Sequence, residues 1–284
     1  MASFLSAPNF ELAATLDSGQ VFHWQEEPDG AFSGCVGDRL LILRQAADGV
    51  LVEPADGVES AISYLRLDQD HQAVLDSFPK EDAVLAAAVA YCPGLRIIRQ
   101  PYWECLATFL TSSLKQVAHI RQISLRVRRE LGEPRELGAI QSSAFPTPSA
   151  VAEAGESRLR ELGLGYRAGF VHRAALLLAS GAMRLEDGEQ LDDSELLEFL
   201  LQFDGVGEKI ANCVRLFGYG RLGAFPVDVW IERIFRERYF EGREVPRKEL
   251  AAFLVHHFGR YGGYAQQYLF HHARTSWGKS RSRP

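Results

Sequence analysis

The pattern of hydrophobic and polar residues divides the chain into two parts. From about residue 10 to 67, short apolar runs such as AFSGCVG and RLLILRQ are separated by turn signals, with Asp-Gly pairs at positions 29, 48 and 56. Runs of this kind are typical of antiparallel strands joined by tight turns. Beyond about residue 70, apolar residues recur at helical spacing, in the segments 83–91, 103–131, 158–164, 171–180 and 196–203.

This change of period predicts an α+β protein with two domains. Glycines and prolines separate the predicted helices by short connections only, as in a compact helical bundle. We expect an N-terminal antiparallel β domain over residues 1–85 and a mostly α-helical domain over residues 86–284.

Composition restricts the class of protein further. Of the 284 residues, 46% are hydrophobic and 24% charged, which is typical of a folded chain. The sequence contains no run of about 20 apolar residues that could span a membrane, and its first residues lack the order of a secretory signal. The four cysteines are too scattered for a metal site, an iron–sulfur centre or a disulfide framework. We therefore expect a cytoplasmic protein with reduced thiols, no metal and no membrane contact.

Charge is distributed unevenly along the chain. The net charge is −6. Residues 1–90 carry 15 acidic and 4 basic side chains, whereas residues 91–284 carry 22 acidic and 27 basic ones. The second part is therefore suited to a polyanion such as a nucleic acid. Basic helix faces that are simply solvated would explain the same asymmetry.

The most informative segment is LLEFLLQFDGVGEKIANCVRLFGYG, residues 196–220. A helix is predicted to end at Asp204, and a second helix to begin near Glu208, after Gly205, Val206 and Gly207. Glycines permit a tight turn and a close approach to phosphate, and the free N–H groups of a helix N-terminus favour an anion. The pattern indicates a helix-hairpin-helix that binds DNA without reading its sequence, although Gly-x-Gly between helices is also an ordinary turn.

Lys209 lies in the first turn of this second helix. The chain has 26 arginines and only five lysines, so arginine is its usual cation. A guanidinium cannot act as a nucleophile at neutral pH, whereas an amine that loses its proton can. Lys209 is therefore a candidate nucleophile, with an ordinary surface lysine as the alternative.

Asp228 follows Pro226 nineteen residues after Lys209, where a new apolar helix is predicted to begin. Aspartate is a favoured N-cap, so Asp228 could serve as a cap alone. If the hairpin folds back, a carboxylate fixed in this way would stand near Lys209 as its electrostatic partner or as a proton acceptor.

The hairpin with Lys209 and the PVD sequence at 226–228 resembles the helix-hairpin-helix Gly-Pro-Asp DNA glycosylases. Four further segments are similar to the 8-oxoguanine DNA glycosylase/AP lyase branch of that superfamily, and the resemblance spans about residues 10–272. These segments are LDSGQVFHWQ (16–25), RQPYWECLATFLTSS (99–113), LRELGLGYRAGFV (159–171) and YGGYAQQYLF (261–270).

The resemblance implies an enzyme that flips a damaged base out of duplex DNA, because the glycosidic carbon cannot be reached inside the stack. Lys209 would attack the sugar C1′, expel the base and form a Schiff base that permits β-elimination of the 3′ phosphate. Asp228 would stabilise the developing positive charge on the sugar. The implied partner is double-stranded DNA containing oxidised guanine. We expect the protein to act as a monomer without a cofactor, and to be associated with the nucleoid when it is bound to DNA.

The same resemblance implies a base pocket. 8-Oxoguanine carries a hydrogen on N7, where guanine has only a lone pair, and the backbone oxygen of Gly19 would accept it. Gln20 belongs to the same SGQ turn and is assigned to the pocket with it. Gln266 would read the Watson–Crick edge, and Phe270 and Cys213 would hold the two faces of the base.

The implied DNA contacts come from the hairpin, from the segment that contains Tyr166 and Arg167, and from Leu114 and His119. Gly205, Val206 and Gly207 would bind backbone phosphates, whereas Tyr166 would wedge the stack and Arg167 would contact the base opposite the lesion.

The sequence departs from the family at four positions. Leu114 stands where an asparagine commonly fills the vacated space, and His119 where a second arginine commonly reads the opposite cytosine. Trp230 replaces a histidine, and Asp204 replaces a proline and would place a negative charge near a phosphate. Loss of an arginine contact to a base implies weaker discrimination of the base opposite the lesion, by about 1–3 kcal/mol.

Two other functions remain open from the sequence. An alkylpurine glycosylase without lyase activity would use the aspartate alone, and Lys209 argues against it. A non-catalytic helix-hairpin-helix protein would use Lys209 only as a phosphate contact. A small-molecule enzyme is disfavoured, because the sequence has no nucleotide-binding glycine motif and no cluster of metal ligands.

Overall fold

The computed structural model of the chain describes residues 1–112 and 116–280, with side chains as far as residue 276. The N-terminal part contains one five-stranded antiparallel sheet in the order β1-β5-β4-β3-β2. Its strands are β1 (Ser3–Ser6), β2 (Gln25–Glu26), β3 (Phe32–Val36), β4 (Arg39–Ala46) and β5 (Gly49–Glu53). The short helices α1 (Leu12–Leu16) and α2 (Val58–Leu65) accompany it.

Two of the three Asp-Gly pairs lie at turns between strands, as the pattern predicts. The pair at 29–30 connects β2 to β3, and the pair at 48–49 connects β4 to β5. The third pair, Asp56 and Gly57, instead forms a 3-10 turn that leads into α2. Gly57 packs tightly on the sheet, because a Cβ there would lie 2.4 Å from Leu41 Cδ2. The β region therefore ends before residue 58 rather than near 67.

The rest of the chain is mostly helical, as predicted. The first helices are α3 (His71–Asp76), α4 (Ala83–Tyr91), α5 (Tyr102–Thr111), α6 (Val117–Leu131), α7 (Pro148–Leu159) and α8 (Ala168–Ala179). The later ones are α9 (Asp193–Leu201), α10 (Glu208–Phe217), α11 (Val229–Ile234), α12 (Arg247–Phe258) and α13 (Gly262–Ser280). The apolar segment 103–131 thus contains two helices, α5 and α6, rather than one.

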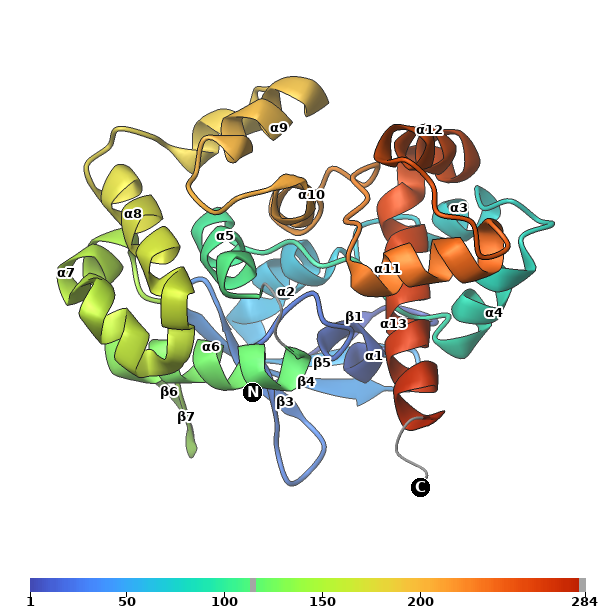
Figure 1. Ribbon diagram of the computed structural model, residues 1–284. Coiled ribbons are helices and arrows are strands. Elements are labelled where there is room, and N and C mark those ends of the chain that lie inside the picture. Colours follow the sequence, from blue (N-terminus) through green and yellow to red (C-terminus); the bar gives the residue numbers. More distant parts are fainter. Residues whose placement is uncertain (113–115, 281–284) are drawn as a thin grey trace.

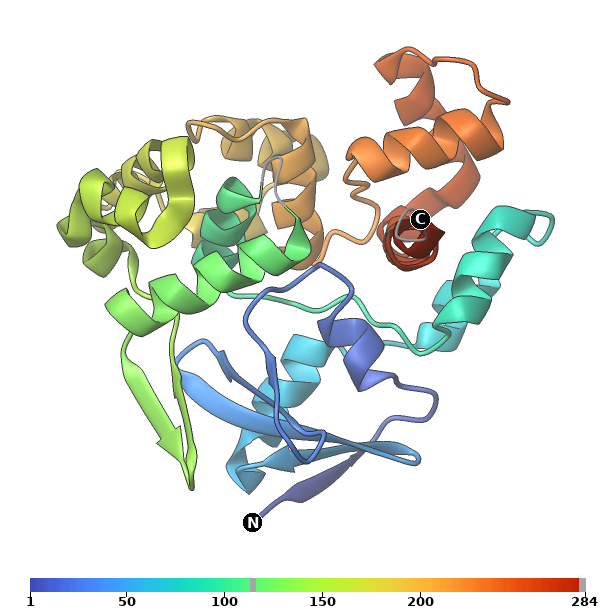
Figure 2. The same ribbon diagram turned by 60° about the horizontal axis from the view of Figure 1, so that its bottom comes forward.

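A hairpin within the helical part was not predicted. It consists of β6 (Pro134–Leu137) and β7 (Ile140–Ser143), and it extends down from α6 toward β3 and β4 (Figure 2). Each strand has only four residues, too few for a clear period-2 pattern. The hairpin ties the helical part to the sheet.

The sheet and the helices have separate hydrophobic cores, and the residues of α3 and α4 pack into the helical one. One core joins the sheet with α1 and α2. The helical core includes Val74 of α3, Leu85 of α4 and, between these helices, Phe78. The predicted boundary between residues 85 and 86 cuts through α4.

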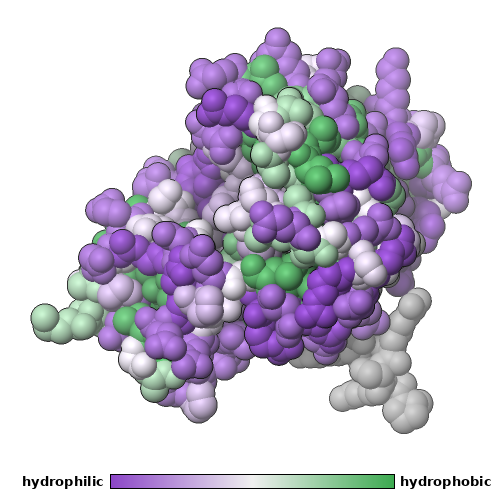
Figure 3. All heavy atoms as spheres, turned by 90° about the vertical axis from the view of Figure 1, so that its left-hand side faces the viewer, coloured by the Kyte–Doolittle hydropathy of each residue, from purple (hydrophilic) through white to green (hydrophobic). Residues whose placement is uncertain are grey.

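The long helix α13 lies between α11 and α12 on one side and α4 on the other (Figures 1 and 2). In Figure 1, α9 lies at the top of the molecule with α10 below it. The face formed by α7 and α8 shows mainly hydrophilic side chains with hydrophobic ones between them (Figure 3). Of the helices in the described part of the chain, none has the length and apolar character needed to cross a membrane.

Candidate active site

The hairpin between α9 and α10 has the geometry that the glycines predict. Gly205 has a φ of +83°, and a Cβ there would lie 2.5 Å from the ring of Phe170 on α8. Val206 is buried and Gly207 is the N-cap of α10, which begins at Glu208 as predicted. Only glycine combines this backbone conformation with such close packing. The hairpin therefore rests on the aromatic ring of α8.

Lys209 extends from the first turn of α10 toward α5. Its Nζ lies 3.4 Å from the hydroxyl oxygen of Ser112 and donates a hydrogen bond to it. The same nitrogen lies 5.4 Å from the centre of the Phe109 ring. The side chain is half-buried. The amine is thus held against a hydroxyl and an aromatic ring, and it is not a freely solvated surface lysine.

Asp228 is the N-cap of α11. Its Oδ1 accepts hydrogen bonds from the backbone N–H of Trp230 at 3.1 Å and of Ile231 at 2.9 Å. Burial raises the pKa of the Asp228 carboxyl, while these N–H groups and the Lys209 charge oppose the rise. The carboxylate is therefore fixed in direction by the helix it caps, and it lies close enough to Lys209 for their charges to interact.

Cys213 lies one turn after Lys209 on α10 and is buried. Burial raises the pKa of its thiol to about 11, with Asp228 adding to the rise and Lys209 opposing it. The thiol is consequently neutral at neutral pH. The structure brings Lys209, Asp228 and Cys213 together from two helices.

Gly19 and Phe270 are in contact although 251 positions separate them in the sequence. Gly19 has a φ of +85°, and a Cβ there would lie 2.9 Å from Phe270 Cε1. Gln266 precedes Phe270 by one turn of α13, so both side chains share a face of that helix. Gln266 is 4% exposed, and its Oε1 accepts no hydrogen bond among the described residues. A buried acceptor without a partner costs free energy, so it marks a position where a ligand can supply the donor.

Gln20 does not join this group. Its Nε2 donates to the backbone oxygens of Thr15 at 2.9 Å and Arg96 at 2.8 Å, and its Oε1 accepts from the N–H of Ile98 at 2.9 Å. The side chain is fully buried. The amide, which the resemblance assigned to the base pocket, is therefore already hydrogen-bonded inside the protein, where it holds the SGQ turn to the segment before α5.

Tyr166 and Arg167 lie in the turn between α7 and α8. Tyr166 is 55% exposed, and the Arg167 guanidinium lies 4.3 Å from the centre of its ring. The ring of Tyr166 also packs edge-on against Phe170, the residue beneath Gly205. The exposed aromatic is therefore connected to the hairpin. Arg167 itself is buried in this structure, so an approach to DNA would require its side chain to turn outward.

The remaining predicted positions have different surroundings. His119 is exposed in the first turn of α6, and Leu114 lies outside the described residues. Asp204 pairs with Arg173 of α8, with Oδ2 and Nε 2.7 Å apart. This partner offsets the negative charge that the sequence analysis considered unfavourable near a phosphate. Trp230 packs against the helical core.

Several supporting residues were missed by the sequence analysis. Ser112 and Phe170 lie in segments that carry the resemblance but had no role assigned to them, and Arg173 gave no signal except its helical spacing. Their contacts join α5, α8 and the hairpin, which lie far apart in the sequence, so no local pattern could have identified them.

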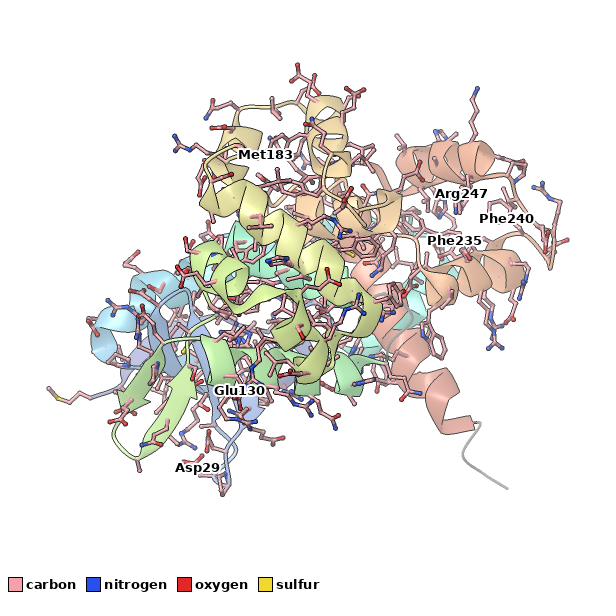
Figure 4. All side chains as sticks on the ribbon, turned by 60° about the vertical axis from the view of Figure 1, so that its left-hand side comes forward. Asp29, Glu130, Met183, Phe235, Phe240 and Arg247 are labelled. Atoms are coloured by element: carbon pink, nitrogen blue, oxygen red, sulfur yellow. The ribbon has the colours of Figure 1, made fainter. Side chains whose placement is uncertain are left out.

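A cavity of about 780 Å³ reaches Lys209 from the side of α12. Gly207 and Lys209 line one wall, and Leu250 and Leu254 of α12 line the other. Arg247, at the start of α12, stands at its edge on the same end of the molecule as Phe235 and Phe240 (Figure 4). The hairpin helix is therefore accessible along its outer side.

Comparisons with known proteins agree with this geometry. The family model described as HhH-GPD superfamily base excision DNA repair protein matches residues 108–256, and the chain belongs to that superfamily. A second model, the N-terminal domain of 8-oxoguanine DNA glycosylase, matches residues 3–106. The resemblance and the α+β fold class inferred from the sequence are thereby confirmed.

Individual relatives are similar over almost the whole chain. A probable N-glycosylase/DNA lyase of Methanothermobacter thermautotrophicus is 29% identical, over 94% of this chain and 95% of its own. MBOgg1, in its structure with a low-affinity DNA ligand, is 30% identical in sequence and matches the fold with a TM-score of 0.90. The match covers 97% of this chain and 99% of MBOgg1. The Clostridium acetobutylicum 8-oxoguanine glycosylase/lyase is 27% identical, with a TM-score of 0.89 for its complex with duplex DNA that has cytosine opposite 8-oxoguanine. The match covers 97% of this chain and 98% of that one.

Proposed function

We propose that this protein is a base excision repair enzyme that removes 8-oxoguanine from duplex DNA and then cleaves the strand as an AP lyase. The observation that carries the proposal is the position of the Lys209 amine beside Asp228 and Cys213 at the start of the hairpin helix. The names of the relatives, which are glycosylase/lyases, support the same reaction class.

Lys209 supplies the nucleophile. Its free amine attacks C1′, the bond from C1′ to the base breaks, and the base leaves with the electron pair of that bond. Opening of the sugar ring then gives a Schiff base between C1′ and Nζ. Loss of a proton from C2′ expels the 3′ phosphate, which nicks the strand. An enzyme that used an aspartate alone could release the base but could not form this covalent intermediate.

Asp228 stabilises the positive charge that develops on the sugar as the base departs. Its two backbone hydrogen bonds hold the carboxylate in one orientation before substrate binds. A charge that needs no reorganisation during the reaction is the most effective kind of electrostatic stabilisation.

The damaged base binds between Phe270 and Cys213, with Gln266 against its Watson–Crick edge and the Gly19 carbonyl at N7. The contact of Gly19 with Phe270 supports this arrangement, as does the Oε1 of Gln266, which has no partner among the described residues. Gly205, Val206 and Gly207 bind the phosphate backbone, and Tyr166 enters the stack beside Arg167. We expect a monomer that works on chromosomal DNA.

Borohydride trapping tests the proposed function. The protein is mixed with a duplex that contains one 8-oxoguanine opposite cytosine, and an undamaged duplex serves as control. A covalent adduct that requires the lesion supports a Schiff-base glycosylase/lyase. Base release without an adduct would indicate the aspartate-only reaction, and binding of both duplexes without either product would indicate a non-catalytic DNA-binding protein.

The rate of excision should depend on pH through Asp228. Only its ionised form stabilises a positive sugar, and burial raises its pKa. Activity should therefore fall, as the solution is acidified, at a higher pH than for an aspartate with the ordinary pKa of about 3.9. The measurement is the rate of 8-oxoguanine release, with excess enzyme, across the acidic range. An acid limb at the ordinary value would contradict the role of the buried carboxylate.

Selectivity for the base opposite the lesion should be weaker than is typical of the family. His119 stands exposed where an arginine commonly reads cytosine, and loss of such a contact removes about 1–3 kcal/mol of discrimination. Excision rates with cytosine, adenine, guanine and thymine opposite 8-oxoguanine measure the effect. His119→Arg should restore a preference for cytosine, whereas a strict preference in the unchanged protein would refute the prediction.

A further inference from the structure

The turn that carries Gly19 is held at its backbone oxygens by side chains from distant elements. Arg274 of α13 donates to the Asp17 oxygen. Gln267, also of α13, donates from Nε2 to the Ser18 oxygen at 2.9 Å. Gln100, just before α5, donates to the Gln20 oxygen at 2.7 Å. Three of the four carbonyls from residue 17 to residue 20 therefore have side-chain donors.

The fourth carbonyl, of Gly19, accepts no hydrogen bond from any residue that the structure describes. A carbonyl that accepts nothing from the protein can accept from a ligand. Because the peptides on both sides of it are held, the direction of the Gly19 oxygen is set before a base arrives. Such preorganisation matters for recognition that depends on one hydrogen bond.

Gln267 is the donor that links this turn most directly to the proposed base pocket. It is 2% exposed and lies next to Gln266 on α13. An amide buried this deeply is favourable only when it is hydrogen-bonded, and a leucine of similar volume would fill the space without that requirement. Gln267 fixes the peptide just before Gly19 from the same helix that carries Gln266 and Phe270.

Gln100 connects the turn to the nucleophile in a similar way. While its side chain holds the Gln20 oxygen, its backbone N–H donates to the oxygen of Phe217 at 2.7 Å. Phe217 is the last residue of α10, the helix that begins beside Lys209. The turn is thus positioned relative to α13 and α10, two of the three helices that carry the proposed site.

We propose that Gln267 is a positioning residue for lesion recognition, which orients the Gly19 carbonyl toward the N7 hydrogen of 8-oxoguanine through its hydrogen bond to the Ser18 oxygen. This inference rests on the proposed function and adds to it a determinant of specificity. Gln267 does not touch the base. Its effect should be confined to the steps that require the damaged base in its pocket.

The test compares Gln267→Leu with Tyr268→Phe. Tyr268 is the neighbouring buried residue of α13, and its hydroxyl bonds to His71 and to the Pro93 oxygen, away from the turn. Tyr268→Phe thus removes a buried hydrogen-bonding group from the same helix and controls for loss of stability. Two rates are measured for each protein: release of 8-oxoguanine opposite cytosine, and borohydride trapping on a duplex with a preformed abasic site, which has no base to recognise.

For Gln267→Leu we expect release of 8-oxoguanine to fall about tenfold, the effect of one lost hydrogen bond, while trapping at the abasic site stays unchanged. Tyr268→Phe should alter neither rate when the protein is folded. Gln267→Glu, which replaces the donor with an acceptor, should be at least as slow as Gln267→Leu.

Two results would overturn the inference. One is release of 8-oxoguanine by Gln267→Leu at the unchanged rate, and the other is an equal fall of both rates, which would show a general structural role. Failure of the proposed function gives a different result, because the unchanged protein would then release no 8-oxoguanine or form no adduct at the abasic site.

Discussion

Lys209→Gln should lose all borohydride trapping on both 8-oxoguanine and abasic-site duplexes. The amide nitrogen of glutamine is not nucleophilic, so no bond to C1′ can form. Base release should also fall, by about a thousandfold or more, because bond making to carbon assists departure of the base. In the folded protein the side chain loses the long hydrogen bond to Ser112, the contact with the Phe109 ring and the interaction of its charge with Asp228. Because the amine is charged and only half-buried, the free energy of unfolding should fall by about 1–3 kcal/mol.

Lys80→Gln is the matched control. Lys80 is exposed in the connection between α3 and α4, so the same change of side chain leaves the hairpin and α10 untouched. It should trap as the unchanged protein does. Retention of the adduct in Lys209→Gln would show that another amine forms the Schiff base, and the assignment of the nucleophile would then fail.

Much of the fold could be predicted because its signals are local. Asp-Gly turns between short apolar runs indicated the sheet, and the helical period indicated α4 with its correct bounds. The hairpin of β6 and β7 has strands too short to show a period, and the boundary between domains depends on which core the side chains of α3 and α4 enter. Both are determined by packing between segments that are distant in the sequence.

The candidate site likewise combines residues that local sequence signals predict with contacts that only the fold reveals. Lys209 and Asp228 stand at helix starts that the sequence marks by glycines, proline and a capping residue. Gln20 illustrates the opposite case, since it was assigned to the base pocket only through the resemblance of the SGQ turn. Its amide is occupied by Thr15, Arg96 and Ile98. Only the fold brings residues 96–98 beside the turn, so the sequence could not reveal that the amide already has partners.

Asp228→Asn separates the two roles that the sequence left open for this residue. Asparagine caps a helix about as well as aspartate, and its side-chain oxygen can accept the same bonds from the N–H groups of Trp230 and Ile231. The start of α11 and the stability of the protein should therefore be kept. The negative charge opposite the developing positive sugar is lost, and release of 8-oxoguanine should slow by about a hundredfold or more.

Asp192→Asn provides the control, because Asp192 caps α9 through the N–H groups of Ser194 and Glu195 and lies in no part of the proposed site. It should change neither stability nor excision appreciably. If Asp228→Asn excised the base at the unchanged rate, Asp228 would be a cap alone, and Lys209 would have to act without electrostatic help. If both variants unfolded to a similar extent, capping would account for the loss. A slow but stable Asp228→Asn, beside a fully active Asp192→Asn, assigns the effect to the charge.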